Sequence, residues 1–174
     1  IALGDIGVPL HVKLMWTYTA PENDWRATEE LARWWAIAAV GTHAIDLATW
    51  FLGANGIPEV RVTREADQGK LEHSATLRLR WKNNKSATIV VSNRVTLPRL
   101  IEVIGSKGVA RCDDTLGAYG KGRISVNGDG MNFTPVDPYR AELTDFVDAI
   151  RSNREPIVSG AIGAYNVDLL HLHN

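Results

Sequence analysis

The segment SATLRLRWKNNKSATIVVSNRV, residues 74–95, decides the fold class of this chain. In its first half apolar and polar side chains alternate, which is the pattern of a strand with one buried face. The apolar face holds Ala75, Leu77, Leu79 and Trp81. An Asn83-Asn84 turn leads into a second strand rich in β-branched residues, so the segment predicts an antiparallel hairpin.

The period of two continues on both sides of this hairpin, from Pro58 to about Phe133. Two more hairpins are expected in this region. The first turns at residues 106–108 between RLIEVIG and VARCDD, and the second turns at NGDG, residues 127–130, between RISV and MNFTPV. The region therefore predicts about five to seven strands that follow one another in the chain.

An earlier strand and the longest helix precede that region. VPLHVKLMWTY predicts a strand from Pro9 to near Ala20, and the polar APENDWRATEEL predicts a surface loop or a short turn of helix. The helix should run from about Arg33 to Leu52, because a glycine and an Asn-Gly turn follow it. Spacings of three and four residues mark its apolar side, which holds Trp34, Ile37, Ala38, Gly41, Ala44, Ile45, Ala48, Phe51 and Leu52.

The chain ends in two further helical patterns. In PYRAELTDFVDAIRSNREP, apolar side chains recur every three or four residues after an early Pro138, at Leu143, Phe146, Val147 and Ile150. The second pattern is IGAYNVDLLHL. A length of 174 residues suits one domain with a hydrophobic core, and we expect residues 1–174 to form that single domain.

The composition argues against several classes of partner. The 19 Lys and Arg residues balance 20 Asp and Glu residues without a long run of one sign, so no nucleic acid and no membrane partner is expected. Cys112 is the single cysteine, which fits a reducing compartment. The longest apolar run, WWAIAAV, is far shorter than the roughly 20 residues that cross a bilayer. We therefore expect a soluble, cytoplasmic protein.

One side of the longest helix carries a histidine and an aspartate. Ala39, His43, Asp46 and Trp50 are spaced four, three and four residues apart and should lie along one line. His43 has two interpretations. It is either a core histidine whose ring is bonded by Asp46, or a general acid and base with a carboxylate beside it. The spacing alone leaves both interpretations open.

Five segments occur in an order that resembles the C-terminal domain of the Gfo/Idh/MocA family, NAD(P)-dependent oxidoreductases of sugars and cyclitols. They are GDIGVPLHV, GTHAIDLATWFLG, VIGSKGV, YRAELTDFVDAIRSNREPIVSG and AIGAYNVDLL. The resemblance implies an α+β fold with a large, mostly antiparallel sheet covered by helices. In that family the domain follows a Rossmann domain, and its sheet supplies substrate contacts and the oligomer interface. The resemblance thus implies a small polyol or sugar as ligand and a homo-oligomer, such as a dimer, formed through the sheet.

The cofactor half of that family has no counterpart in these residues. No strand is followed by G-x-G-x-x-G, and the Glu-Lys-Pro motif that carries the family's catalytic lysine is missing. We expect no cofactor to be bound by this chain, while the resemblance implies NAD(P) for a parent enzyme whose Rossmann domain lies in cis or in trans. His171 and His173 are wrongly spaced for two ligands on one helical face, so no metal is expected either.

The same resemblance assigns site residues. The family helix carries Asp-x-Gly-x-His and a later Asp, so the catalytic histidine falls on His43 and the later aspartate on Asp46. The first aspartate of the motif falls on Ala39, whose methyl group can neither bind a substrate hydroxyl nor hold the imidazole. A mechanism that needs this carboxylate should be impaired. The substrate-binding candidates are Trp16, Tyr18, Arg26, Asp46 and Arg94.

Two functions follow from these expectations. The first is the substrate-binding and oligomerisation domain of an NAD(P)-dependent sugar or polyol oxidoreductase, a dehydrogenase that is inactive as the isolated chain. The second is a stand-alone, non-catalytic module for binding or self-association, which Ala39 and the missing cofactor motifs favour. Cofactor-dependent turnover of a polyol distinguishes the two functions.

Overall fold

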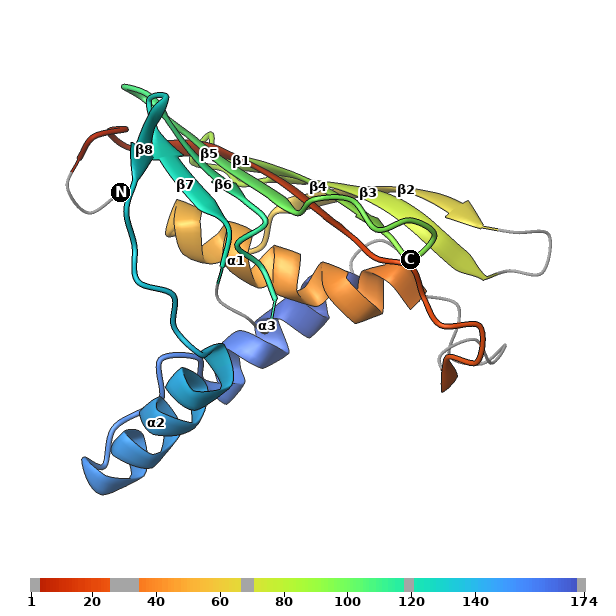
Figure 1. Cartoon of the computed structure of the whole chain (residues 1–174). Helices are drawn as coiled ribbons and strands as arrows, with labels where there is room; N and C mark the ends of the chain where they lie inside the picture. Colours follow the sequence, from red (N-terminus) through yellow and green to blue (C-terminus); the bar gives the residue numbers. More distant parts are fainter. Residues whose placement is uncertain (1–3, 26–34, 67–70, 118–120, 172–174) are drawn as a thin grey trace.

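The computed structural model describes residues 4–25, 35–66, 71–117 and 121–171 of the chain. An eight-stranded sheet forms one layer, and the described helices lie on one side of it, so its other face is bare (Figure 1). The strands are β1 (Pro9–Thr17), β2 (Glu59–Ala66), β3 (Glu72–Arg80), β4 (Ser86–Ser92), β5 (Leu100–Gly105), β6 (Val109–Asp113), β7 (Arg123–Val126) and β8 (Asp129–Met131). The helical elements are η3 (Ile37–Gly41), α1 (Thr42–Leu52), α2 (Pro138–Arg151) and α3 (Gly160–His171). The predicted α+β class is confirmed.

The strands lie in the order β2-β3-β4-β1-β5-β6-β7-β8. Neighbouring strands are antiparallel except β1 and β4, which run parallel. The mostly antiparallel sheet implied by the resemblance is therefore confirmed. The predicted run of strands is present as β2 to β8, but β1 lies between β4 and β5 and divides that run into two halves.

The hairpin of residues 74–95 forms as predicted. The side chains of the predicted apolar face are at most 4% exposed, namely Ala75, Leu77, Leu79 and Trp81. Across the hairpin, Ser74 lies opposite Ser92 and Arg80 lies opposite Ser86. Asn84 has a φ of 62° at the tip, a left-handed conformation that asparagine tolerates better than most residues. The alternation of apolar and polar side chains and the asparagine turn thus both predict the hairpin that the structure shows.

The last hairpin differs from the prediction. Its turn is Asn127-Gly128, with φ values of 54° and 95°, because a two-residue hairpin turn needs two left-handed residues. Asp129 and Gly130, predicted as part of the turn, belong to β8 and pair with β7. The predicted strand MNFTPV is a strand only at Met131. Its partner β7 is four residues long, and three of these residues pair with β8.

The longest helix contains the π-helical segment η3. Residues 35–52 are helical, which confirms the predicted end at Leu52, while the predicted start at Arg33 lies outside the described residues. Gly53 ends the helix with a φ of 53°. The turn of η3 is wider than that of an α-helix, which changes the side chains that face inward. As a consequence Val40 is buried and Ala38 is exposed. The predicted apolar side included Ala38 and omitted Val40, and was wrong at both positions.

The hydrophobic core lies between the sheet and the helix of η3 and α1. It is built from side chains that are at most 2% exposed, including Val12, Leu14, Leu77, Ile89, Ile37, Ile45 and Leu52. β1 and β4 supply the centre of the sheet side of this core. The position of α1 is therefore fixed over the parallel strand pair.

The helix α2 forms where it was predicted but does not bury its apolar side. The Asp137 carboxylate caps it by accepting hydrogen bonds from the N–H groups of Tyr139 at 3.0 Å and Arg140 at 3.1 Å. Ala149 is the buried residue of this helix. The predicted apolar side chains are 40 to 67% exposed, namely Leu143, Phe146, Val147 and Ile150.

Candidate functional site

The parallel strand pair brings predicted binding residues to one edge of the sheet. Parallel strands end on the same side, so the residues that follow β1 meet those that follow β4. The Tyr18 N–H donates to the Ser92 carbonyl at 3.0 Å, and Thr19 forms a bridge with Arg94. Trp16, Tyr18 and Arg94 therefore lie along one edge, which we call the β1–β4 edge. Trp16 and Tyr18 are half-buried and Arg94 is exposed.

His43 of α1 lies over this edge. Its side chain is exposed, and its ring stacks on the ring of Trp16 with the centroids 5.5 Å apart and the planes inclined by 30°. Within the described residues no hydrogen bond joins His43 to Asp46, whose carboxylate bonds Asn166 instead. The interpretation of His43 as a core histidine bonded by Asp46 is therefore wrong. An exposed imidazole can exchange a proton with a bound molecule.

Arg99 is a third member of this cluster, and sequence reasoning missed it. Its guanidinium carbon lies 5.4 Å from the centroid of the Trp16 ring, which is within the range of a cation–π contact. Nη1 of Arg99 donates to the Leu116 carbonyl, which holds the guanidinium in place. No motif marks Arg99 in the sequence, because it simply precedes a strand. The cluster is thus a stack of imidazole, indole and guanidinium.

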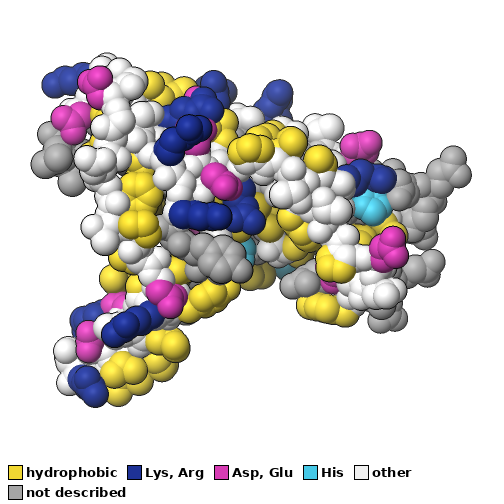
Figure 2. Space-filling view, in the orientation of Figure 1, with side chains coloured by type: hydrophobic (Ala, Val, Ile, Leu, Met, Phe, Trp, Pro, Cys, Tyr) yellow, Lys and Arg dark blue, Asp and Glu magenta, His cyan; other side chains and the backbone are white. Residues whose placement is uncertain are grey.

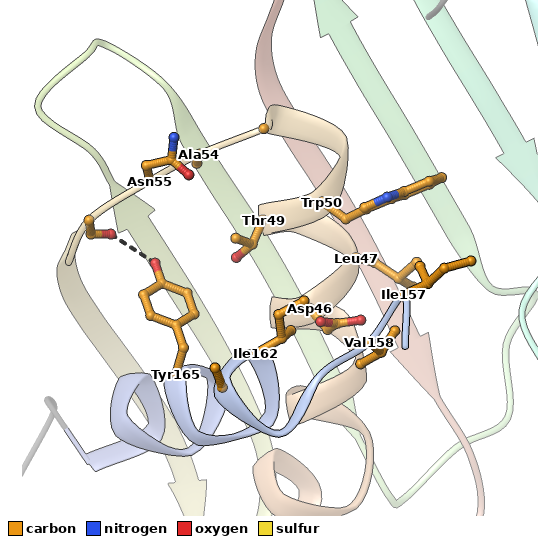
Figure 3. A pocket seen from close by; sticks show the side chains of 13 residues that line it. Asp46, Leu47, Thr49, Trp50, Ala54, Asn55, Ile157, Val158, Ile162 and Tyr165 are labelled. Atoms are coloured by element: carbon orange, nitrogen blue, oxygen red, sulfur yellow. Dashed lines mark hydrogen bonds between the residues drawn. The ribbon is translucent and has the colours of Figure 1, made fainter. Parts of the chain in front are cut away.

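Asp46 belongs to a second place, a groove between α1 and α3 that we call the α1–α3 groove (Figure 3). It has a volume of about 570 Å³ and a mostly apolar lining that includes Leu47, Trp50, Ile157, Val158 and Ile162. Oδ1 of Asp46 accepts a hydrogen bond from Nδ2 of Asn166 at 2.9 Å. Near the other end the Tyr165 hydroxyl donates to the Gly56 carbonyl at 2.8 Å. Asp46 thus joins α1 to α3, a role that sequence reasoning did not foresee.

The four positions predicted to share one helical line differ in burial. Ala39 and Asp46 are half-buried, whereas His43 and Trp50 are exposed. Ala39 lies in η3 and packs against the hydrophobic core. Its methyl group is therefore a packing group one turn before His43. Arg26, the remaining predicted binding residue, lies outside the described residues.

Glu72 is a buried carboxylate that the sequence pattern did not reveal. It is 1% exposed, its Oε1 accepts the Ile37 N–H at 2.8 Å, and its Oε2 lies 3.4 Å from Nε of Arg64. Burial raises the pKa of Glu72 to about 7, although the Ile37 hydrogen bond and the Arg64 charge oppose this rise. A bulge where Glu65 pairs with Ser74 and Ala66 pairs with Glu72 turns this carboxylate inward. Alternation alone cannot place such a bulge.

The described helix N-termini do not fit a dinucleotide. Such termini bind a pyrophosphate through unpaired N–H groups. Here the Asp137 carboxylate caps α2. At α3 the hydroxyl oxygen of Ser159 accepts the Ile162 N–H at 3.4 Å. A pyrophosphate at the N-terminus of α2 would meet a carboxylate, and at α3 a hydroxyl group already occupies one N–H group.

Two further features concern the part of the chain that the structure describes. There, no group of three or more His, Cys, Asp or Glu side chains is arranged to hold a metal ion. None of the described helices combines the length and the apolar character needed to span a membrane.

Polar and aromatic side chains are found together at the β1–β4 edge. Arg94 carries a guanidinium, Tyr18 a phenol and His43 an imidazole, and all three can bond a hydroxyl group. The indole of Trp16 adds an apolar face beside them. The chemistry of this edge therefore suits a compound that carries several hydroxyl groups.

Solved structures with this fold come from longer proteins. The aldose-aldose oxidoreductase of Caulobacter crescentus, complexed with glycerol, is similar with a TM-score of 0.83 and 20% identity, over 98% of this chain and 53% of that chain. UDP-N-acetylglucosamine 3-dehydrogenase GnnA of Acidithiobacillus ferrooxidans gives a TM-score of 0.78 and 18% identity, over 99% of this chain and 56% of that chain. The WlbA dehydrogenase of Bordetella pertussis, in complex with NADH and UDP-GlcNAcA, gives a TM-score of 0.72 and 20% identity, over 98% of this chain and 55% of that chain. The chain thus spans about half the length of these proteins and shares the fold of that half.

The sequence itself assigns the family. No curated protein sequence matches the chain. The family model described as the GFO/IDH/MocA C-terminal domain matches residues 1–111, a range that includes Trp16, His43 and Arg94. The chain therefore belongs to the GFO/IDH/MocA C-terminal domain family.

Proposed function

We propose that this chain is the substrate-binding and oligomerisation domain of an NAD(P)-dependent oxidoreductase of sugars or polyols. One observation carries the proposal: His43, at the position that the family resemblance assigns to the catalytic histidine, is exposed and stacked on Trp16 at the β1–β4 edge. The fold neighbours support the substrate class, because they include an aldose-aldose oxidoreductase complexed with glycerol.

The side chains of the edge have separate tasks in this proposal. His43 takes the proton of the substrate hydroxyl that becomes a carbonyl, which is the work of a general base. Arg94 and Tyr18 bind the other hydroxyl groups, and Arg26, which lies outside the described residues, is a further candidate for that task. Trp16 is a positioning residue for His43, because the two rings stack. Asp46 contributes to this site from the α1–α3 groove, where its hydrogen bond from Asn166 joins α1 to α3.

The cofactor NAD(P) comes from outside these residues in this proposal. The described N-termini of α2 and α3 are capped by Asp137 and Ser159, and the sequence lacks G-x-G-x-x-G. The isolated chain is therefore inactive in hydride transfer. Neighbours such as the WlbA dehydrogenase, in complex with NADH, support a cofactor domain in the parent enzyme. Its compartment would be the cytoplasm.

The bare face of the sheet is the proposed surface for self-association into a dimer. Strand register places Glu102 between Lys13 and Arg111, and its carboxylate lies 3.7 Å from the former and 3.1 Å from the latter. In the adjacent row Val90, Met15 and Leu100 lie side by side. A surface with apolar and charged parts of this kind is typical of contacts between protein subunits.

Ala39 favours a second candidate, a non-catalytic binding or self-association module. It occupies the position of the family motif's first aspartate and packs against the core. The polypeptide of the complete reading frame separates the candidates when it is assayed with NAD⁺ or NADP⁺ and a panel of polyols. Polyol-dependent reduction of the cofactor supports the oxidoreductase, and its absence with intact polyol binding supports the module.

Binding at the β1–β4 edge is tested by NMR titration of the purified chain with glycerol, myo-inositol and glucose. We expect signals of Trp16 and His43 to shift, and His43→Ala to weaken binding. Arg78→Ala on the bare sheet face is the matched control and should leave binding unchanged. Shifts confined to the bare face, or none with any of the three compounds, would contradict the proposed ligand class.

A further inference from the structure

The helix that carries His43 lies against a buried carboxyl group. Figure 2 shows acidic side chains spread over the molecular surface, whereas Glu72 is 1% exposed. Among the described residues it is the one Asp, Glu, Lys or Arg whose side chain is buried. Burying such a group is costly unless hydrogen bonds and an opposite charge offset the loss of water. The partners of Glu72 therefore indicate its role.

Two successive N–H groups of the helix bond Glu72. Its Oε1 accepts the Ile37 N–H at 2.8 Å, and the Ala36 N–H bonds the same carboxyl group. The side chains of Ala36 and Ile37 are fully buried. Glu72 is the first residue of β3, so these bonds join the helix to a strand that lies 35 positions further along the chain. The backbone of residues 36–37 is thereby fixed relative to the sheet.

Ile37 is also the first residue of the π-helical segment η3. Its carbonyl accepts the N–H of Thr42, which is five residues on, whereas the spacing in an α-helix is four. Gly41 lets this wide turn pack closely, because a Cβ at that position would lie 3.3 Å from Cγ2 of Ile37. Ile37 is thus held at its N–H by Glu72 and at its carbonyl by the residue that precedes His43.

The π turn sets the place of the His43 ring. A π turn holds one residue more than an α turn, so its loss would rotate the helix on one side of it by about 100° relative to the other. His43 is the second residue of α1, which follows η3, and its ring stacks on Trp16 with the centroids 5.5 Å apart. A rotation of that size would carry the imidazole away from the indole.

We propose that Glu72 is a positioning residue for His43: by holding the Ile37 N–H it maintains the π turn that places the imidazole on Trp16. This inference rests on the proposed function only for the task of His43 as a general base. Glu72 acts through the helix backbone and does not itself meet the substrate. The imidazole is then positioned from two strands, by β3 through the π turn and by β1 through the indole.

The protonation of Glu72 should adjust this arrangement. Burial raises the pKa of Glu72 to about 7, although the Ile37 hydrogen bond and the Arg64 charge oppose the rise. The charged and titratable groups that face it are Arg64 of β2, whose Nε lies 3.4 Å from Oε2, and His73, the next residue of β3. A carboxylate accepts a stronger hydrogen bond than a neutral carboxyl group. The bond from Ile37 should therefore strengthen as pH rises through about 7.

NMR spectroscopy of the purified chain tests the inference. In the parent we expect the ring current of Trp16 to shift the ring protons of His43 upfield. Glu72→Leu removes the acceptor, so most of that upfield shift should be lost, whereas Glu72→Gln keeps an acceptor oxygen and should retain it. Glu65→Leu is the matched control, because Glu65 lies in β2 at the same bulge but is exposed. It should leave the shift unchanged.

A pH titration of the parent gives a second measurement that does not depend on the folding of Glu72→Leu. The amide proton of Ile37 should move downfield with a midpoint at about 7, and Glu72→Gln should abolish this change. A titration that persists in Glu72→Gln would come from His73 and would overturn the inference. An unchanged His43 shift in folded Glu72→Leu would overturn it as well.

The outcomes separate this role of Glu72 from the proposed function. The His43 shift can depend on Glu72 while the polypeptide of the complete reading frame reduces neither NAD⁺ nor NADP⁺ with any polyol. That result supports the positioning role and contradicts the oxidoreductase. Polyol-dependent reduction of the cofactor together with a His43 shift that is independent of Glu72 supports the oxidoreductase and overturns the positioning role.

Discussion

The ring of Trp16 in β1 stacks on the ring of His43 in α1, with the centroids 5.5 Å apart. This contact joins the helix to the parallel strand pair, near the Tyr18–Ser92 hydrogen bond and the bridge between Thr19 and Arg94. One face of the imidazole is thereby held by the indole, while the exposed side chain still reaches solvent. The orientation of His43 is therefore set by a neighbour in the sheet and by its own helix.

A double-mutant cycle should detect this stack as a coupling energy. We expect Trp16→Leu and His43→Ala to show a coupling of about 0.5–1.5 kcal/mol in the free energy of unfolding, the usual range for aromatic pairs. Urea denaturation of the four proteins measures it. The control cycle combines His43→Ala with Trp50→Leu, since Trp50 contacts Phe51. A coupling as small as that of the control would contradict the stack.

The hydrogen bond between Asp46 and Asn166 should stabilise the contact between α1 and α3. Asp46→Ala leaves the buried Asn166 amide without its partner, so we expect a loss of about 1–3 kcal/mol in the free energy of unfolding. Asp46→Asn keeps an oxygen acceptor at nearly the same place and should cost less than half as much. Chemical denaturation compares the two variants. Equal losses would show that the carboxylate acts through its charge instead.

Glu72 should make the stability of the protein depend on pH. Its pKa is about 7 in the folded chain against an ordinary value of 4.5, so the folded state holds the proton more tightly. The stabilisation is complete below pH 4.5 and is lost as pH rises through about 7. Glu72→Gln keeps an acceptor for the Ile37 N–H and cannot ionise. Its stability relative to the parent should therefore increase between pH 5 and 8, by up to about 3 kcal/mol.

Thermal unfolding of both proteins across that pH range measures the effect. The control is Glu65→Gln, because Glu65 lies in β2 near Glu72 but is exposed. That variant should follow the pH dependence of the parent. A constant difference between the parent and Glu72→Gln at all pH values would show that the buried carboxylate does not change its protonation in this range.

Ala39→Asp should strengthen polyol binding at the β1–β4 edge. A carboxylate one turn before His43 adds a charged acceptor for a hydroxyl group, and we expect a gain of about tenfold in affinity. Because Ala39 is half-buried, the variant should also lose about 1–3 kcal/mol of stability. Ala38→Asp is the matched control, since Ala38 is exposed. Calorimetric titration with myo-inositol measures the affinity of both variants. Equal affinities would show that position 39 has no special role in polyol binding.

Val90→Arg should weaken self-association if the bare face of the sheet forms the dimer. Val90 is 37% exposed and lies beside Met15 in that face, so the substitution places a charge among apolar contacts. Analytical ultracentrifugation at several concentrations should show a dissociation constant at least tenfold higher. Ile57→Arg, at an exposed position before β2, should leave it unchanged. A parent protein that stays monomeric at all concentrations would contradict the proposed dimer.

Much of the fold could be predicted because it depends on short-range patterns. Alternation fixed the buried face of β3, and Gly53 marked the end of α1. The position of β1 between β4 and β5 could not be predicted in this way, since strand order depends on contacts between residues far apart in the chain. The π-helical segment at Val40 and the bulge beside Glu72 also leave no local signal.

The candidate site was predictable only in part. Trp16, Tyr18, His43 and Arg94 were singled out, and the structure gathers them at one edge. The interpretation of His43 as a core residue failed because its burial depends on how α1 is rotated over the sheet. The bond from Asn166 to Asp46 was missed, since the two residues are 120 positions apart. Side chains that meet across such distances become visible only in the folded chain.

The parallel pairing of β1 has a consequence for how the protein folds during its synthesis. His11 in β1 bonds Ser86 in β4, a partner 75 residues further along the chain. At about 5–20 residues per second, a ribosome needs several seconds to produce that partner. Val12 and Leu14 have no sheet neighbours until then, because β1 pairs only with β4 and β5. β1 can thus be completed in the sheet only after β2 and β3 have been synthesised, so its apolar side chains stay without their sheet neighbours for that interval.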